Sequence, residues 1–481
     1  MEVISKEYVE SELARYKTPG MGIGVIQDGK VVFAKGFGYR DMSTTASITE
    51  NTQWGIASCT KSFTATLCGM LADEGYFTLE QPIREYLPDF QMYDPVATEL
   101  CTLKDMLCHR TGLGGYDAVW ADSCTREDLW RRLRYLRPNA SFRGLVQYNN
   151  LIYTMAGHVC EKVTGLSWDQ LVQERIFAPL GMNDSNTSIV DLMKSSDFAQ
   201  PYWPTDEGPV PVDNWNVDLG APAAAINSTI NDMLKWLQFN LDDGVVNGKR
   251  LIKKETLEEI HTAQVRYKLW PWDFPENPPM AGYALGWYND VYRGIPVYWH
   301  IGEIEGYGTM MAVLPRQKTG IVLFNNLHAP DVLIQCSVMD TIIDNLLGLT
   351  PGNWAERYYA QRNNYGYMLG DWRCDLMGVD QVKGTSLSHD LKSYVGEYYE
   401  PGHGTIKIFQ KDDGLGMIYR GVEQPMKHYH YDVFKVSCIK MDTLVVTAPL
   451  SFRTNSRDGS IDGFEFKLYP QVEPILFKRS K

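Results

Sequence analysis

The sequence predicts a mixed α/β (α+β) fold, with a central antiparallel sheet and a helical subdomain, followed by a small antiparallel β-barrel. Three observations indicate this arrangement. Short apolar runs typical of strands occur within 22–37 and again within 297–325. The sequence between these regions is mainly helical in pattern, and short alternating segments recur after residue 391. Strands on both sides of a helical region indicate one sheet that joins the two ends of the first domain.

The length and the local composition set the domain limits. A chain of 481 residues is long enough for two or three domains. After Pro351 and Gly352 the sequence is rich in Arg, Asn, Tyr and Gly, which is typical of a linker. We therefore predict a first domain at 1–348, a linker at 349–387 and a barrel domain at 388–481.

The first domain is expected to begin with an amphipathic helix at 7–16 and a β-hairpin. The hairpin prediction rests on Asp28 and Gly29, a turn pair that separates the apolar runs 22–27 and 30–37. Further helices are expected at 63–74, 102–108, 126–136, 151–163, 167–176, 229–240 and 331–347. Further strands are expected at 297–302, 307–314 and 320–325, and aromatic loops that line a cleft at 201–218 and 270–287.

The barrel prediction rests on the regular spacing of short alternating segments. Turn sequences such as 411–414 and 457–459 separate them. Such spacing is typical of a small antiparallel barrel. The expected strands are 394–399, 405–410, 416–420, 431–436, 443–448, 463–469 and 474–478.

The bulk composition excludes several classes of function. The net charge is −13, from 46 basic and 59 acidic residues, which argues against nucleic acid or an anionic membrane as a partner. The first ten residues lack the basic and apolar regions of a signal peptide, and no apolar run reaches membrane-spanning length. Nine scattered cysteines without zinc-site spacing fit buried thiols in a reducing compartment. We expect a cytoplasmic protein with no cofactor and no metal site.

The motif that organises the first domain is Ser58-x-x-Lys61. The residues that follow it, 63–74, have apolar positions at helical spacing, so Ser58 lies at a helix start and Lys61 about one turn later on the same face. A serine hydroxyl becomes a good nucleophile when a nearby base removes its proton, and a lysine can be that base. The helix start adds N–H groups that favour a carbonyl oxygen as it becomes negative.

A second copy of this pattern, Ser437-x-x-Lys440, shows that the pattern alone is weak. It lies in the alternating segment 431–437, where strand geometry places the two side chains on opposite faces. Only the first copy opens a helix, so we choose Ser58 and Lys61.

Two further motifs complete the candidate site. Tyr148-x-Asn150 precedes the helix predicted at 151–163; a phenol beside a lysine loses its proton more easily, and an asparagine can hold both the lysine and a substrate amide. A capping Asn and a packed Tyr are the alternative for this motif taken alone.

For a donor on a strand the candidates are His300 and Lys318. We choose His300, which ends an aromatic strand, because Lys318 lies in a polar hairpin turn.

The order Ser-x-x-Lys, Tyr-x-Asn, His-x-Gly resembles the serine β-lactamase-like superfamily, which includes class C β-lactamases, DD-peptidases, related esterases and D-aminopeptidases. The resemblance covers about 5–347. The tail resembles the lipocalin-like domain found behind many such hydrolases. Supporting stretches are 87–90 (LPDF), 102–113 (TLKDMLCHRTGL) and 177–182 (FAPLGM), and in the tail 427–434 and 472–477.

The resemblance implies a role for each matched residue. Ser58 attacks an acyl carbon, Lys61 and Tyr148 shuttle protons, and Asn150 orients the substrate. The backbone N–H groups of Ser58 and Glu303 would form an oxyanion hole.

The resemblance also concerns two other positions, Gly302 and His109. Gly302, just before Glu303, is grouped with the oxyanion-hole and substrate-binding residues. The glycines of the following return, 306–308, are expected to let substrate approach the backbone closely. His109 matches a structural histidine of the family and is expected to be scaffold.

The substrate hypothesis depends on His300, because most β-lactamases and DD-peptidases have lysine at that position. A histidine is largely neutral at pH 7, so strong selection for a free carboxylate is less expected. We predict a serine hydrolase acting on ester or amide substrates, with D-amino-acid peptides among them. The alternatives are a β-lactamase or DD-carboxypeptidase, an acyltransferase or macrocyclase, and a non-catalytic penicillin-binding-like sensor. The expected partner is a small-molecule or peptide substrate, and a homo-oligomer remains open.

Overall fold

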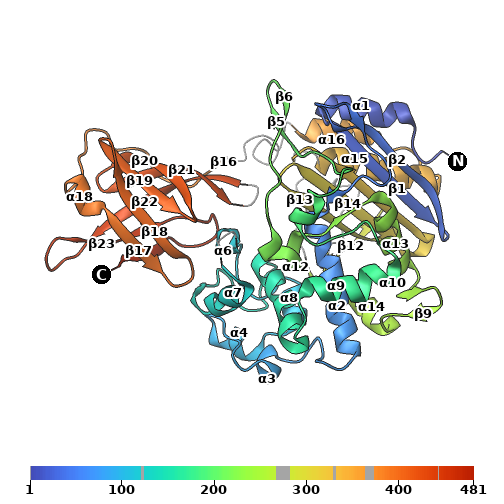
Figure 1. The fold of residues 1–481 in the computed structure, drawn as a ribbon, viewed down its shortest axis with the longest axis horizontal. Coiled ribbons are helices and arrows are strands. Elements are labelled where there is room, and N and C mark those ends of the chain that lie inside the picture. The colour runs from blue at the N-terminus through green and yellow to red at the C-terminus, as the bar shows by residue number, and fades with distance from the viewer. Residues whose placement is uncertain are drawn as a thin grey trace.

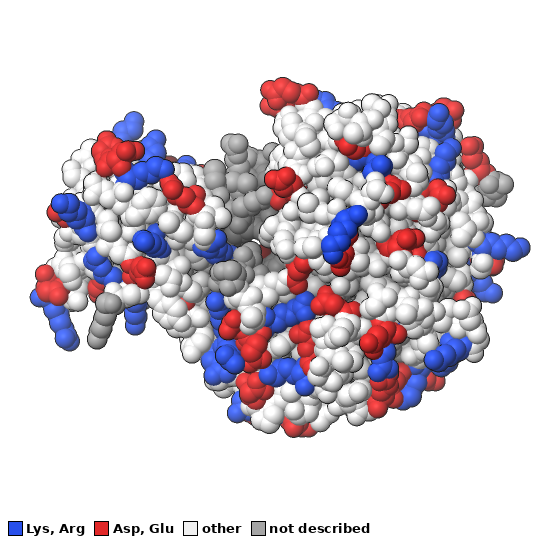
Figure 2. Space-filling view, in the orientation of Figure 1, with Lys and Arg blue, Asp and Glu red and all other residues white. Residues whose placement is uncertain are grey.

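The computed structural model describes residues 2–120, 124–266, 282–328, 332–362, 373–441 and 444–480. Figure 1 shows a large body that contains the N-terminus and a smaller β-barrel that contains the C-terminus. No helix in these described ranges is both long and apolar enough to cross a bilayer. On the face drawn in Figure 2, basic and acidic side chains are interspersed over both bodies.

The large body is built on a nine-stranded antiparallel sheet, which confirms the predicted fold class. The central strand β1 pairs with β2 on one side and with β15 on the other, so that Val25 lies opposite both Phe33 and Ile321. The sheet therefore joins the two ends of the first domain, as the strand pattern predicted. Its strands, in spatial order, are β10 (Val265–Arg266), β11 (Gly282–Tyr283), β12 (Tyr288–Tyr292), β13 (Ile295–Ile304), β14 (Tyr307–Leu314), β15 (Thr319–Asn325), β1 (Gly20–Gln27), β2 (Lys30–Asp41) and β3 (Ala46–Ser47).

Helices cover both faces of this sheet. One face packs against α1 (Lys6–Tyr16), α15 (Val332–Leu347) and α16 (Trp354–Arg362). The other face packs against α2 (Thr60–Asp73) and α13 (Ile230–Leu241), where the rings of Phe63 and Trp236 stack at 3.9 Å. Gly24 allows α13 to approach, because a Cβ there would lie 2.7 Å from a methyl group of Ile230. Helix α2, which follows Ser58, is therefore fixed between the sheet and the helical subdomain.

The helical subdomain follows the predicted order, with small differences. The segment predicted as a loop at 201–218 contains a hairpin, β5 (Tyr202–Thr205) with β6 (Gly208–Pro211). Of the other aromatic segment, predicted at 270–287, residues 270–281 lie outside the described residues. The helices are α3 (Ile83–Tyr86), α4 (Pro95–Leu100), α5 (Leu103–Leu107), α6 (Asp117–Trp120), α7 (Arg126–Arg132), α8 (Asn150–Thr164), α9 (Trp168–Val172), α10 (Ala178–Leu180), α11 (Ile189–Leu192), α12 (Ala221–Ala224) and α14 (Lys254–His261).

The C-terminal body is a closed eight-stranded antiparallel barrel, as predicted, with one short extra strand, β16 (Arg373–Asp375), parallel to β22. The pairing of β22 with β23 closes it. Aromatic rings such as Tyr398, Phe452 and Phe464 fill its interior, so it has a packed core. The strands are β17 (Gly396–Glu400), β18 (Gly404–Lys411), β19 (Gly414–Tyr419), β20 (Val422–His430), β21 (Val433–Met441), β22 (Leu444–Thr454), β23 (Ile461–Phe466) and β24 (Ile475–Arg479).

Two details of the barrel were not predicted. Strand β20 is additional, and Tyr394 ends a short helix, α18 (Leu391–Tyr394), instead of beginning a strand. The domain limits at 348 and 388 and the lipocalin-like character of the barrel stay predictions.

Candidate active site

Ser58 lies on a tight turn between the sheet and α2. The turn is a single 3₁₀ helix, η1 (Ala57–Cys59), directly ahead of α2, so the predicted position at a helix start is what the structure has. Ala57 has a left-handed φ of 44°, a conformation that costs energy for a residue with a Cβ. The turn is held in place because Ile56 N donates to Ile226 O at 2.9 Å. Ser58 itself stays half-buried, with its hydroxyl at the edge of a packed core.

Lys61 lies one turn further along and is completely buried. Its Nζ donates to Ser58 Oγ at 2.8 Å, to Asn150 Oδ1 at 2.7 Å and to the Ala223 carbonyl at 3.0 Å. An ammonium group has three N–H donors and no acceptor, and these three contacts use all of them. These three contacts hold the amine of Lys61 within hydrogen-bond reach of the Ser58 hydroxyl.

The Tyr148–Asn150 segment approaches Lys61 from the start of α8. Asn149 is the cap of this helix and accepts a hydrogen bond from Ile152 N at 2.9 Å, whereas Asn150 faces Lys61. The half-buried Tyr148 places its ring with the centroid 4.8 Å from Lys61 Nζ. The capping role and the candidate functional role thus belong to two neighbouring asparagines.

His109 accepts hydrogen bonds from the backbone on both sides of Tyr148. Its carbonyl accepts from Gln147 N at 2.7 Å, its Nδ1 accepts from Asn149 N at 3.1 Å, and its ring lies 4.4 Å from the Tyr148 ring. Burial lowers the pKa of this imidazole well below its usual value, so it is neutral. These contacts fit the scaffold role expected for His109.

His300 lies on β13 and is buried with both ring nitrogens occupied. Nδ1 is 2.5 Å from the Ile301 carbonyl, and Nε2 is 3.0 Å from the hydroxyl of Tyr283. Because a carbonyl only accepts, Nδ1 carries the proton and Nε2 accepts from Tyr283. Burial, with a smaller contribution from the charge of Lys61, lowers the pKa of His300 to about 3. The imidazole is thus neutral near pH 7 and has no free donor, whereas a donor was expected at this position.

Gly302, two residues after His300 on β13, lies against the Ser58 turn. A Cβ at Gly302 would lie 2.1 Å from the Ile56 carbonyl oxygen and 3.1 Å from Ser58 N, so only glycine permits this approach. Glu303 follows with a half-buried carboxyl group whose pKa burial raises to about 7. The strand backbone at Gly302 therefore runs directly beside the backbone of Ser58.

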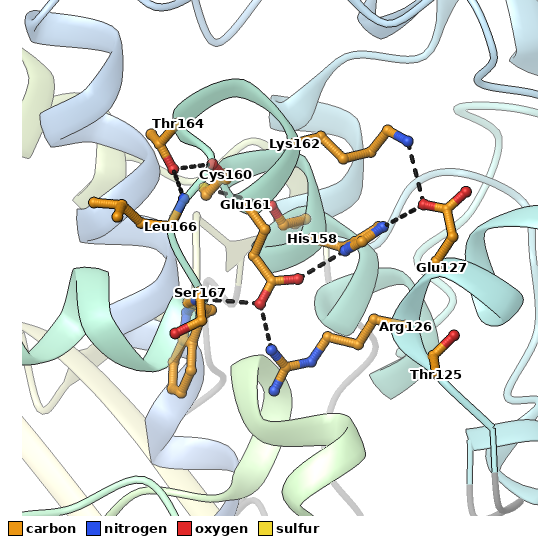
Figure 3. Close-up of polar contacts among 12 residues, drawn as sticks. Thr125, Arg126, Glu127, His158, Cys160, Glu161, Lys162, Thr164, Leu166 and Ser167 are labelled. Carbon is orange, nitrogen blue, oxygen red and sulfur yellow. Dashed lines mark hydrogen bonds and ion pairs between the residues drawn. The ribbon is translucent and has the colours of Figure 1, made fainter.

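A network of charged side chains links helices α7 and α8 (Figure 3). His158 lies between Glu161, 2.7 Å from Nδ1, and Glu127, 3.2 Å from Nε2. Arg126 pairs with Glu161 and also donates to the carbonyls of Asp218 and Leu219, at 2.9 and 3.0 Å. The network thus ties α7 and α8 to the turn before α12, and so relates Asn150 on α8 to the Ala223 carbonyl on α12.

The predicted site residues lie at different distances from one another. Ser58, Lys61 and Asn150 are in direct hydrogen-bond contact, and Gly302 touches the Ser58 turn. The ring of His300 lies 6.4 Å from that of Tyr148.

The rejected candidates lie elsewhere in the fold. Lys318 is exposed in the turn between β14 and β15. Ser437 lies in barrel strand β21, and the side chain of Lys440 is outside the described residues.

Three contributors to the site were not predicted. Tyr283 lies in the aromatic segment for which only a cleft-lining loop was expected. Ala223 contributes a backbone carbonyl, which has no side-chain signature. Asp117 accepts a hydrogen bond from Asn150 Nδ2 at 3.0 Å and belongs to no motif. Within the described parts of the chain, no three His, Cys, Asp or Glu side chains lie where they could share a metal ion.

Comparison with known proteins identifies the family. The family model described as Beta-lactamase matches residues 6–334, and a domain of unknown function, DUF3471, matches 380–479. The chain therefore belongs to the Beta-lactamase family, which places it in the serine β-lactamase-like superfamily.

Curated relatives and solved structures agree with this assignment. "Unguisins hydrolase ungD" of Aspergillus violaceofuscus is 29% identical over 83% of this chain and 75% of its own length. "Protein flp" of Staphylococcus aureus is 26% identical over 67% of this chain and 62% of its own length. Family and relatives support an enzyme of the serine hydrolase type.

Two solved structures share the fold. The octameric penicillin-binding protein homologue from Pyrococcus abyssi has a TM-score of 0.62 at 22% identity, covering 98% of this chain and 99% of that one. A class C β-lactamase from Rhodobacter sphaeroides has a TM-score of 0.59 at 20% identity, covering 71% of this chain and 98% of that one. The first similarity extends over the barrel as well as the sheet domain.

Proposed function

We propose that this protein hydrolyses ester or amide substrates through an acyl-enzyme on Ser58. The observation that carries the proposal is the contact of Lys61 Nζ with both Ser58 Oγ, at 2.8 Å, and Asn150 Oδ1, at 2.7 Å, at a half-buried turn. A nucleophile in hydrogen-bond reach of its proton-transfer partner, which a third group orients, is the pattern of covalent catalysis. The hydrolase name of the Aspergillus relative adds support.

The reaction would proceed in two steps. Ser58 Oγ attacks the acyl carbon and loses its proton to the Lys61–Tyr148 pair, while the bond to the leaving alcohol or amine breaks and that group takes the proton. Lys61 is arranged as an ammonium, and a positive charge beside a phenol favours the phenolate, so Tyr148 is the proposed base. Water then adds to the acyl carbon and gives its proton to the same pair. The bond between the acyl carbon and Ser58 Oγ breaks, Oγ takes that proton back, and the acid is released.

The backbone N–H groups of Ser58 and Glu303 are the proposed oxyanion hole. Gly302 supports this assignment, because it lets β13 run beside the backbone of Ser58. Donors fixed at such a position stabilise the negative oxygen of the tetrahedral intermediate.

The substrate class follows from the neutral His300. A buried neutral imidazole whose Nε2 already accepts from Tyr283 offers no charge and no free donor to a carboxylate. We therefore propose uncharged esters or amides, including peptides of D-amino acids, in preference to the free carboxylates of penicillins.

Labelling with a fluorophosphonate, followed by intact mass measurement and peptide mapping, tests the proposal. We expect one adduct, on Ser58, and none on Ser58→Ala, which should also lose ester and amide hydrolysis. Hydrolysis by Ser58→Ala at the wild-type rate would refute the mechanism. Efficient hydrolysis of nitrocefin, a carboxylate-bearing β-lactam, would refute the substrate class while leaving the mechanism standing.

We also propose self-association, supported by the octameric state of the Pyrococcus abyssi homologue. Light scattering of the purified protein should give a mass above the 54.7 kDa of one chain. A monomer at all concentrations would refute it.

A further inference from the structure

The carboxylate of Asp117 holds the amide of Asn150 in one orientation. Asn150 Nδ2 donates to Asp117 Oδ1 at 3.0 Å, and its Oδ1 accepts from Lys61 Nζ at 2.7 Å. A carboxylate only accepts and an ammonium only donates, so the amide fits between them in a single sense. If the amide turned over, its N–H groups would face the ammonium and its oxygen would face the carboxylate, and both contacts would be repulsive.

Asp117 begins α6, the helix of the large body that lies next to the barrel in Figure 1. The residue before it, Tyr116, is only 2% exposed. Its ring lies 4.9 Å from the ring of Tyr469 and 5.7 Å from that of His403, both in the barrel domain. Its hydroxyl donates to the Arg137 carbonyl at 2.7 Å. Tyr116 is therefore fixed between the helical subdomain and the barrel.

The barrel side of this contact is rigid. Glu400 Oε2 accepts from Gly402 N at 2.7 Å, from His403 N at 2.9 Å and from His403 Nδ1 at 2.6 Å. Gly402 packs so closely that a Cβ there would lie 2.8 Å from a methyl group of Leu136. The hydrophobic core is continuous from the helical subdomain into the barrel at this point.

We propose that the barrel domain orients Asn150 for catalysis by fixing Tyr116 and, through it, Asp117. Asp117 is then a positioning residue: it touches Asn150, which in turn contacts Lys61. The proposal rests on the proposed function and assigns the barrel a part in it. The links are the ring contact between Tyr469 and Tyr116, the peptide bond between Tyr116 and Asp117, and the hydrogen bond from Asn150 to Asp117.

The test compares four variants of the full chain by the rate constant for fluorophosphonate labelling of Ser58 and by the midpoint of thermal unfolding. Asp117→Ala should slow labelling by about 10- to 100-fold, the usual effect of losing a hydrogen bond to a charged group. Asp117→Asn keeps an acceptor and should recover much of that loss. Tyr469→Ala, which removes a barrel ring from Tyr116, should slow labelling by about fivefold or more.

The matched control is Phe452→Leu, which removes a buried barrel ring that packs on Tyr394, Tyr398, Phe434 and Phe464 and not on Tyr116. It should lower the unfolding midpoint and leave the labelling rate of the folded protein unchanged. If Tyr469→Ala and Phe452→Leu behave alike, the barrel only stabilises the fold and the proposal is wrong.

A crystal structure of Asp117→Ala separates this proposal from the proposed function. We expect the Asn150 side chain to leave Lys61 Nζ or to turn over. Asn150 still in its original contact, together with labelling at the wild-type rate, would overturn the positioning role and leave the role of Ser58 intact. Equal labelling of the wild type and Ser58→Ala would instead refute the proposed function, and the position of Asn150 would still decide whether Asp117 orients it.

Discussion

A methyl group added at Gly302 should disrupt acylation more than any other change of that size on β13. The new Cβ would lie 2.1 Å from the Ile56 carbonyl oxygen, whereas such atoms essentially never approach closer than 3.0 Å. The strand and the Ser58 turn must therefore separate by about 0.9 Å, the difference between the two distances. A second close contact, 3.1 Å to Ser58 N, adds to the same displacement.

The expected loss of activity follows from that displacement. A shift of about 1 Å in a catalytic arrangement costs about 100-fold, and loss of one oxyanion-hole donor costs about 100- to 1,000-fold. We therefore expect Gly302→Ala to lower kcat/KM for an activated ester by about 100- to 1,000-fold. The buried hydrogen bond between Lys61 and Asn150 involves no residue of β13, so it should persist.

The assay is ester hydrolysis together with fluorophosphonate labelling, measured on protein shown to be folded by its thermal transition. The matched control is Gly414→Ala in the barrel, where a Cβ would meet nothing closer than 3.8 Å. The control should keep full activity. A folded Gly302→Ala protein with activity within fivefold of the wild type would show that the approach of β13 to the Ser58 turn does not matter for catalysis.

Two further predictions concern residues away from the reacting atoms. Lys318→Ala should keep the rate of hydrolysis within about twofold, because the lysine is exposed in a turn; a loss of tenfold or more would contradict its exclusion from the site. Burial lowers the pKa of His261 from 6.5 to about 4, so the unfolded state binds more protons between these values and stability is lost as the pH falls. The control is His261→Gln, which keeps a donor for Asn240 Oδ1. Relative to this variant, the wild type should lose about 3 kcal/mol of unfolding free energy between pH 7 and pH 4, as measured by urea denaturation. Parallel pH profiles of the two proteins would contradict this.

The sheet could be predicted from the sequence because its signals are local. The Asp28-Gly29 pair predicts the first hairpin, and an apolar run on either side predicts its strands. Strand β20 was not predicted because Pro425 interrupts a run of mostly polar residues, and a proline removes one donor from a strand. Its place in the barrel comes from pairing with β19 and β21, contacts that the segment itself does not encode.

The site likewise has some residues that local sequence predicts and others that it does not. Ser58 and Lys61 are three residues apart, so helical geometry alone brings them together, and the structure has their contact at 2.8 Å. The Ala223 carbonyl and the Tyr283 hydroxyl arrive from distant segments, and nothing in their local sequence marks them. Asp117 is one of 59 acidic residues, and only the folded chain shows that its carboxylate faces Asn150.

The neutral state of His300 and the charged state of Lys61 depend on each other. The charge of Lys61 contributes to the low pKa of His300, and the same repulsion, acting in reverse, would make Lys61 lose its proton more easily if position 300 carried a positive charge. With a neutral imidazole there, position 300 carries no positive charge that would oppose an ammonium at Lys61, which fits the proposal of Tyr148 as the base. A lysine at this position would favour carboxylate substrates and would also weaken the hold of Lys61 on its proton. One residue of β13 therefore bears on both the charge of the preferred substrate and the choice of base.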